Sequence, residues 1–191
     1  MTETVNFPLK GKRDYVHGTS IFNELVLQAK RAGLESGRIN LTFKNKVDNN
    51  VCLIERRVPR KEDAVIAKLD GSNGDPELYI SLNPSSEGAP AERVDFDEDN
   101  ICQDGLLFES SIELKGATHH DSIEMVVALC KKMHLQLVDA EKKWVFSRYL
   151  GAFPIPKGKD IKLVLVKKVG TKLTCSKVYI DGSEVADIYF S

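Results

Sequence analysis

The two halves of the chain resemble each other weakly, and this internal repeat constrains the fold more than any single motif does. PLKGKRDYVHGTSIFNELVLQAKR in the first half corresponds to ELKGATHHDSIEMVVALCKK in the second, and the two share Leu-Lys-Gly and, further along, Ser-Ile. The halves also close on similar stretches, LDGSNGDPELYIS and IDGSEVADIYFS. Because these matches keep the same order along the chain, we interpret the halves as two copies of one structural unit.

Each half predicts the same succession of elements, which is a strand, a helix and four further strands. Asp-Gly pairs at 70–71 and 181–182 predict the turn before the last strand of each half. In the first half the strands are expected near Val5 to Tyr15 and at 39–45, 50–55, 64–69 and 77–82, with the helix from about Ser20 to Ala32. In the second half the strands are expected at 106–114, 143–150, 160–168, 172–180 and 184–191, with the helix from about Ser122 to Leu137.

The second helix is apolar around most of its circumference over two turns, so we expect protein to surround it. The first helix is apolar over a narrower face. Between the halves, NPSSEGAPAERVDFDEDN combines turn-forming residues with a dense acidic stretch at 95–99. We interpret 84–103 as an acidic linker between a first repeat at 1–83 and a second at 104–191. The alternative is an acidic loop that binds a partner.

Charge and composition exclude several classes of function. The formal net charge of -1 gives no reason to expect nucleic-acid binding. No apolar run approaches the roughly 20 residues that cross a bilayer, and MTETVNFPLKGK lacks the apolar core of a signal peptide, so we expect a cytoplasmic protein that does not span a membrane. The cysteines form no CxxC pair, which predicts reduced thiols, several of them in the core, and neither a disulfide framework nor a structural zinc site. They are Cys52, Cys102, Cys130 and Cys175.

A strand, a long helix and three or four antiparallel strands resemble the hotdog fold, and two copies in one chain resemble a double hotdog. The resemblance implies an α+β architecture of two repeats. In each repeat a long central helix is wrapped by a curved antiparallel sheet, and the repeats form an intrachain pseudo-dimer that could associate into a homo-oligomer. A helix-grip domain and an α+β sandwich without internal symmetry are the alternatives, and both would make the repeat a coincidence.

The residues just before each helix, which we call the helix entrances, read YVHGTSI and THHDSI. A helix N-terminus leaves about four N–H groups without intrahelical partners, and together with the helix dipole they attract an oxygen that carries negative charge. A thioester carbonyl fits this environment, and Gly18 would allow it close to the backbone. His17, or His119 or His120 at the other entrance, could move a proton at neutral pH. Asp121 could act as general base, orienter or nucleophile.

Hotdog proteins commonly process acyl thioesters of coenzyme A or acyl carrier protein, as dehydratases, hydratases or thioesterases. The resemblance implies a site where a helix N-terminus polarises the thioester carbonyl while a histidine or carboxylate performs acid-base work. His17, Gly18 and Thr19 occupy that position in the first half, and His119, His120 and Asp121 occupy it in the second. The chain lacks the family's dehydratase motif of His with closely spaced Gly and Pro, and also the usual thioesterase pattern around Asp or Glu.

Our hypothesis is an acyl-thioester enzyme, with dehydratase or hydratase chemistry favoured over thioester hydrolysis and no cofactor implied. The alternative is a non-catalytic double hotdog that binds an acyl chain or a protein partner. A purely structural interpretation also applies to the entrances, because Thr19 or Ser20 would be a normal N-cap and Asp121 with Glu124 resembles a capping box. No carboxylate–histidine spacing accompanies His119 and His120, so we expect no metal.

Basic residues predict two further binding positions. ERRVPRK places four cations around Pro59 in a loop, where they could hold the phosphates of coenzyme A or contact an acidic carrier protein, or could simply be solvated. Arg148 is expected on an otherwise apolar strand face with Trp144, Phe146 and Leu150. There it could pair with a carboxylate across the pseudo-dimer interface or bind a substrate carboxylate or phosphate. The loop cations are Arg56, Arg57, Arg60 and Lys61.

Overall fold

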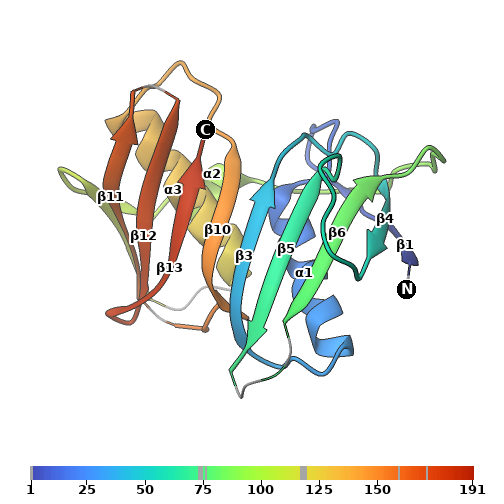
Figure 1. The fold of residues 1–191 in the computed structure, drawn as a ribbon. Coiled ribbons are helices and arrows are strands. Elements are labelled where there is room, and N and C mark those ends of the chain that lie inside the picture. The colour runs from blue at the N-terminus through green and yellow to red at the C-terminus, as the bar shows by residue number, and fades with distance from the viewer. Residues whose placement is uncertain (1, 73–74, 76, 117–119, 159, 171) are drawn as a thin grey trace. The chain divides into compact units, whose positions relative to one another are not determined.

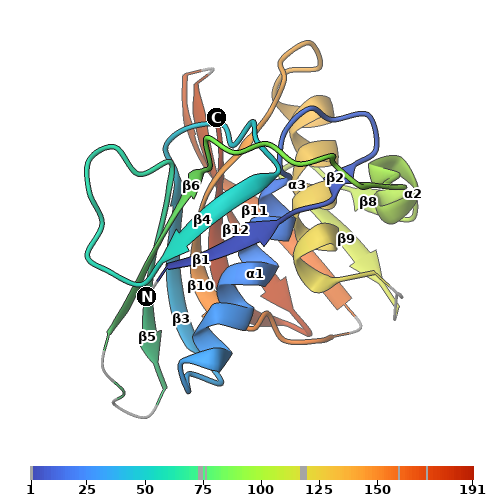
Figure 2. The same cartoon turned by 90° about the vertical axis from the view of Figure 1, so that its right-hand side faces the viewer.

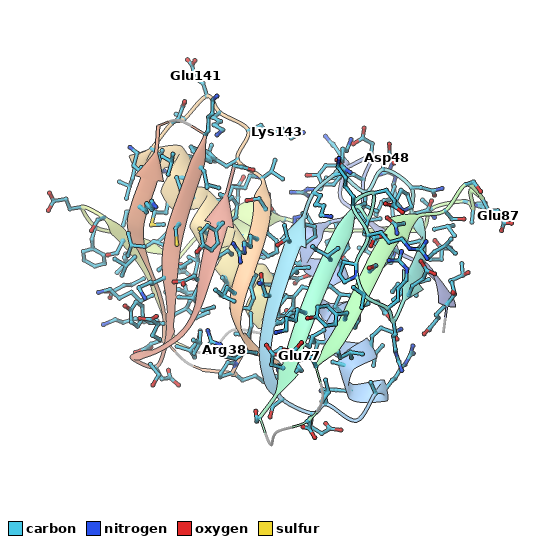
Figure 3. The ribbon with its side chains drawn as sticks, viewed as in Figure 1. Arg38, Asp48, Glu77, Glu87, Glu141 and Lys143 are labelled. Atoms are coloured by element: carbon cyan, nitrogen blue, oxygen red, sulfur yellow. The ribbon has the colours of Figure 1, made fainter. Side chains whose placement is uncertain are left out.

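The computed structural model describes residues 2–72, 75, 77–116, 120–158, 160–170 and 172–191. The chain divides into two compact units, Met1–Phe96 and Asp97–Ser191, which we call unit 1 and unit 2. Each unit combines one long helix with an antiparallel sheet, and Figures 1 and 2 show the helix lying against one face of the sheet of its own unit. Exposed charges such as Glu87 and Glu141 lie on loops (Figure 3).

In unit 1 the described strands follow the order β1-β4-β6-β5-β3, with antiparallel pairing between all neighbours. A short parallel pair, β2 with β7, lies outside this sheet. The elements are β1 (Thr2–Asn6), β2 (Leu9–Lys10), α1 (Gly18–Arg31), β3 (Gly37–Phe43), β4 (Val51–Glu55), β5 (Val65–Gly71), β6 (Leu78–Pro84) and β7 (Arg93–Val94).

The core of unit 1 follows from two periodicities. On β5, Val65, Ala67 and Leu69 are buried in alternation with more exposed neighbours, as a strand with one face against a core requires. On α1 the buried apolar residues recur at helical spacing, so this helix presents a single stripe to the core. They are Ile21, Phe22, Leu25, Val26 and Ala29.

In unit 2 the described strands follow the order β8-β9-β11-β12-β13-β10, again with antiparallel neighbours. Asp181 and Gly182 have φ of 47° and 81° and connect β12 to β13 as a two-residue hairpin turn, so the predicted Asp-Gly turn is confirmed here. The elements are α2 (Glu98–Cys102), β8 (Leu106–Leu107), β9 (Ser111–Lys115), α3 (Ser122–Leu137), β10 (Phe146–Phe153), β11 (Asp160–Val169), β12 (Leu173–Ile180) and β13 (Ser183–Phe190).

Helix α3 is buried around most of its surface, as its sequence predicted. His134 is a polar member of this buried set and is 0% exposed, with Nε2 against the hydroxyl of Thr174 and Nδ1 against the carbonyl oxygen of Cys130. Its ring also lies 4.8 Å from that of Trp144 and 5.2 Å from that of Phe190. Burial is the main cause that lowers the pKa of His134.

Several sequence predictions differ from the structure in detail. The strand predicted near Val5 to Tyr15 is two short strands, β1 and β2, and the run 106–114 is likewise broken into β8 and β9. The pair at 70–71 is the end of β5 rather than the turn before β6, because the strand continues through Gly71 opposite Gly37. The segment 84–103 contains β7 and α2, and the carboxylate of Asp97 caps α2 by accepting from two backbone N–H groups.

Within the described ranges, no helix has both the length and the apolar character needed to cross a membrane.

Candidate functional site

The entrance of α1 is formed by His17, which is the N-cap residue with φ −70° and ψ 138° and makes no side-chain cap hydrogen bond. The helix therefore begins earlier than predicted, and the interpretation of Thr19 or Ser20 as the N-cap is wrong. The carbonyl oxygen of His17 accepts from the N–H groups of Ser20 and Ile21 at 3.0 and 3.2 Å. Among the described residues, no acceptor lies against the backbone N–H groups of Gly18 and Thr19, which are the first two of the helix.

Three buried polar side chains meet at this entrance, and we call them the Lys10–Thr19–His17 cluster. Lys10 Nζ donates to Thr19 Oγ1 at 2.8 Å, and His17 Nδ1 lies 2.7 Å from the same hydroxyl oxygen. Lys10 is 7% exposed, His17 6% and Thr19 0%. Three polar side chains this deeply buried need well-formed hydrogen bonds, and the shared hydroxyl supplies them.

Phe96 lies over this cluster. Its ring centroid is 5.1 Å from that of His17 and 4.7 Å from Lys10 Nζ, and the guanidinium of Arg13 is 5.2 Å from it. The segment that carries Phe96 is held to unit 1 by the β2–β7 pairing and by Arg93, which donates to two backbone carbonyl oxygens. The pairing thus fixes an aromatic wall beside His17.

The electrostatics of this entrance favour an oxygen with negative charge. The first turn of α1 contains no acidic residue, so the positive end of the helix dipole is not neutralised there by its own side chains. The ammonium of Lys10 adds a buried positive charge beside the same turn. In a nearly dry environment such groups act more strongly than they would in water.

The entrance of α3 is built differently. Asp121 is the N-cap, and its carboxylate accepts from the N–H of Ile123 at 3.0 Å, which confirms the predicted cap. Asp121 and His120 are both exposed. His119 was predicted as a candidate together with them, and it lies outside the described residues. The structure therefore places one candidate histidine, His17, in a buried polar cluster and the other described one, His120, at the surface.

The candidate loop cations divide into two pairs. Arg57 forms a bidentate ion pair with the fully buried carboxylate of Asp63, with distances of 2.7 and 2.8 Å, and Arg56 donates to the side chain of Gln28 at 3.0 Å. These two side chains therefore hold the loop to the body of unit 1. The other two, Arg60 and Lys61, have exposed side chains that remain available to an anion.

Asp63 anchors the connection between β4 and β5. It also accepts from Ser81 and Asn83 on β6, the strand that this connection passes, and from the backbone N–H of Arg60. The hydrogen bonds from Arg57 are the largest of the causes that hold the pKa of Asp63 well below its usual range.

Arg148 does not share a face with Phe146, and that prediction is wrong. A register shift between the two residues pairs Phe146 with Phe190 but Arg148 with Tyr189, so the bulge moves Arg148 to the opposite face of β10. Its guanidinium lies 5.6 Å from the centre of the Tyr189 ring.

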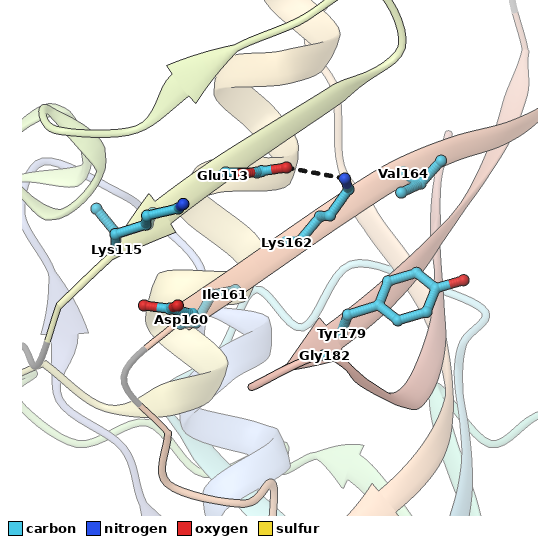
Figure 4. Close-up of a pocket in the computed structure, with 9 residues that line it drawn as sticks. Glu113, Lys115, Asp160, Ile161, Lys162, Val164, Tyr179 and Gly182 are labelled. Atoms are coloured by element: carbon cyan, nitrogen blue, oxygen red, sulfur yellow. Dashed lines mark ion pairs between the residues drawn. The ribbon is translucent and has the colours of Figure 1, made fainter.

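A surface pocket of about 450 Å³ lies over β9, β11 and β12 in unit 2 (Figure 4). Glu113 and Lys162 point toward each other across it and form an ion pair at 2.8 Å, which lowers the pKa of Glu113. Because these charges neutralise each other, the pocket is a weaker candidate for acid-base chemistry than the α1 entrance.

Sequence reasoning missed Lys10 and Phe96 as parts of the site. Lys10 lies in the Leu-Lys-Gly stretch shared by the two halves, which indicates a repeat and not a site, and Phe96 lies in no motif; the two come together beside His17 where β2 and β7, far apart in sequence, pair. The four cysteines are all buried and unpaired, and burial raises the pKa of the Cys52 thiol to about 12, which argues against a nucleophilic role for it. Among the residues whose placement is known, no group of three or more His, Cys, Asp or Glu side chains is arranged to hold a metal ion.

No protein-family model and no curated protein matches the sequence. Solved structures do match the whole fold. The tesB protein of Mycobacterium avium subs paratuberculosis is similar with a TM-score of 0.55 at 11% identity, over 99% of this chain and 91% of that one. The dehydratase domain of the polyketide PpsC from Mycobacterium tuberculosis has a TM-score of 0.52 at 12% identity, over 100% and 91%.

The 12:0-ACP thioesterase from Umbellularia californica has a TM-score of 0.50 at 11% identity, over 100% of this chain and 96% of that one. These structures have the hotdog fold, and the likeness shows that fold for this chain, in agreement with the resemblance found in the sequence. At such low identities the likeness concerns the fold alone.

Proposed function

We propose that the protein processes acyl thioesters, with an acyl group bound to coenzyme A or to a carrier protein as substrate. Dehydration or hydration is favoured over thioester hydrolysis. The observation that carries the proposal is the α1 entrance, where the N–H groups of Gly18 and Thr19 lack acceptors among the described residues and His17 lies beside them. The N–H groups would polarise the thioester carbonyl, and His17 would be the acid-base group.

The proposal includes the arrangement of the chain as two hotdog repeats, 1–83 and 104–191, joined by the acidic linker 84–103 into an intrachain pseudo-dimer in the cytoplasm. Support comes from the same succession of described elements within 1–83 and 104–191, which is two strands, a long helix and four strands. The hotdog structures similar to this chain include proteins described as a thioesterase and as a dehydratase domain, which is why both reactions remain under test.

We place the reacting site at α1 rather than α3. At α3 the carboxylate of Asp121 already occupies a first-turn N–H and brings negative charge to the place where a carbonyl oxygen would bind. Arg60 and Lys61, with exposed side chains, are the residues of the basic loop suited to the phosphates of the acyl carrier. Because His17 is only 6% exposed, the proposal also requires the imidazole to become more accessible when substrate binds.

The test is a panel of acyl thioesters of increasing chain length, assayed both for hydration and dehydration of the acyl chain and for release of free thiol. His17→Ala is expected to lower kcat by about 10²–10⁴-fold, the usual contribution of a general acid or base. His120→Ala is the matched control, since it removes an exposed histidine at the other entrance, and it should change the rate less than about threefold.

Turnover by the wild type that is unaffected by His17→Ala would overturn the mechanism. Absence of turnover with every thioester, together with an acyl ligand retained in native mass spectrometry, would favour the alternative of a non-catalytic acyl-chain-binding module.

A further inference from the structure

The hydrogen bonds of the Lys10–Thr19–His17 cluster have a direction that can be deduced from its chemistry. The hydroxyl of Thr19 contacts two side-chain nitrogen atoms, Lys10 Nζ at 2.8 Å and His17 Nδ1 at 2.7 Å. A lysine ammonium has only donors, so in the first contact the hydroxyl oxygen of Thr19 accepts. The same hydroxyl carries one proton, and Thr19 is 0% exposed.

A buried hydroxyl proton without an acceptor costs free energy, so the proton of Thr19 must find one. Of the two side-chain nitrogens that it contacts, only an unprotonated imidazole Nδ1 can accept. If His17 carried a proton on Nδ1, the Thr19 oxygen would accept twice and its own proton would point at no acceptor among the described residues. The arrangement that satisfies every group therefore has Thr19 donating to Nδ1.

We infer that Lys10 is a positioning residue that acts through Thr19 to fix the neutral imidazole of His17 in the tautomer with its proton on Nε2. The ammonium orients the hydroxyl, and the hydroxyl selects the nitrogen that stays unprotonated. The tautomer itself follows from geometry alone. Its catalytic meaning rests on the function proposed above.

The consequence for chemistry is that resting, neutral His17 offers an N–H donor at Nε2 and no acceptor there. It can donate a hydrogen bond to a substrate oxygen, but it cannot remove a proton from a substrate through Nε2. If the Nε2 proton is transferred, Nδ1 takes the hydroxyl proton of Thr19 and that hydroxyl takes one from the ammonium of Lys10, so that no imidazolate is left. His17 would thus enter a reaction on the acid side, and a base for the same reaction has to come from another group or from water.

The tautomer can be measured on the full chain without any substrate. Protein labelled with ¹⁵N-histidine would be studied by two-bond ¹H–¹⁵N correlation spectroscopy at about pH 8, above the ordinary histidine pKa. The chain has four histidines, and the His17 signals are assigned by their disappearance in His17→Gln. His134 provides an internal reference with the opposite tautomer, protonated on Nδ1. Its Nδ1 lies against the carbonyl oxygen of Cys130, which can only accept a hydrogen bond.

We expect the Nε2–H pattern for His17 in the wild type and in Thr19→Ser, which keeps the hydroxyl. Thr19→Val, which has the same shape without the hydroxyl, should give a mixture of tautomers. Lys10→Met should also give a mixture, since the Thr19 oxygen is then able to accept from Nδ1–H. Dispersed backbone spectra check that each variant is folded.

A wild-type His17 with its proton on Nδ1 overturns the inference, and this result stands even where a variant does not fold. A folded Lys10→Met that keeps the full Nε2–H pattern overturns the role of Lys10. Neither result depends on turnover, so failure of the proposed function in the thioester assays is distinguishable from failure of this inference.

Discussion

Units 1 and 2 both have two strands before a long helix and four sheet strands after it, but they arrange those strands differently. After the helix, unit 2 follows the order β11-β12-β13-β10, in which strands consecutive in sequence from β11 to β13 are neighbours. Unit 1 follows β4-β6-β5-β3, so β6 lies between β4 and β5. The physical difference is the connection. Strands β11 and β12 are consecutive in sequence and pair directly, whereas residues 56–64 cross from β4 past β6 to β5.

The crossing in unit 1 explains why a carboxylate is buried there. Asp63 binds Arg57 from the crossing segment and Ser81 and Asn83 from the strand that it passes. A hairpin needs no such anchor, because the backbone bonds of its two strands hold it. The comparison shows that a similar succession of helices and strands can form sheets with different strand orders. The strand order changes where one connection between strands is longer and a buried polar side chain holds that connection in place.

The largest expected effect comes from breaking this anchor. Asp63→Ala removes the fully buried carboxylate of the ion pair and leaves Arg57, whose side chain is 18% exposed, with Glu55 at 2.9 Å as its remaining carboxylate partner. Removal of one member of a buried ion pair typically lowers the free energy of unfolding by about 3–5 kcal/mol, and we expect the low end of that range because Arg57 is part-exposed and keeps Glu55. Hydrogen exchange read by mass spectrometry should show loss of protection in peptides from β5 and β6, with peptides from β12 and β13 much less affected.

The control is Asp48→Ala, which removes an exposed carboxylate from the same unit (Figure 3) and should change stability by less than about 0.5 kcal/mol. Equal loss of protection in both units after Asp63→Ala would contradict the view that Asp63 anchors a feature of unit 1 alone.

The sequence predicts the elements better than their pairing. Helix α3 begins and ends where predicted, because Asp121 is a recognisable cap before a strongly apolar run. Helix α1 begins earlier than predicted because His17 caps it without a characteristic side chain. The position of β6 between β4 and β5 depends on contacts between strands distant in sequence, and periodicity carries no information about those.

The candidate site shows the same limit. His17, Gly18 and Thr19 were predicted from their place before an apolar helix. Lys10 was not, because its contact with Thr19 depends on how the segment 11–17 folds back onto the start of α1, and no sequence pattern indicates that path. Strict alternation likewise assigns Arg148 to the same face of β10 as Phe146, and the bulge between them places it on the opposite face.

The second prediction compares how the stability of the two units depends on pH. Burial lowers the pKa of His134, so below about pH 6.5 the unfolded chain binds a proton that the folded chain does not. His134 should therefore lower the free energy of unfolding of unit 2 as pH falls below about 6.5. The loss is up to about 1.4 kcal/mol per pH unit and stops once the pH reaches the lowered pKa. For Asp63 the lowered pKa means that stability is lost only below about pH 4, where the unfolded carboxyl takes up its proton.

Denaturant unfolding between pH 8 and 2 checks this, with wild type compared with His134→Gln. The variant should lose the part of the slope that begins near pH 6.5 and should keep the loss of stability below pH 4. Identical slopes in the two proteins would show that His134 does not titrate between the folded and unfolded states as its burial requires.

The smallest expected effect concerns the two helix entrances. Asp121→Ala removes the side-chain cap of α3 and should lower the free energy of unfolding by about 1 kcal/mol, whereas Asp121→Asn keeps an accepting oxygen and should be nearly neutral. At α1 the side chain of His17 makes no cap hydrogen bond, so His17→Ala has no cap to lose, and its effect on stability comes from other contacts of the imidazole, among them those with Thr19 and Phe96. A cap that only supports α3 should leave the chemistry at His17 unchanged. If Asp121→Ala also lowered turnover of an acyl thioester by tenfold or more, the assignment of the reacting site to α1 alone would have to be abandoned.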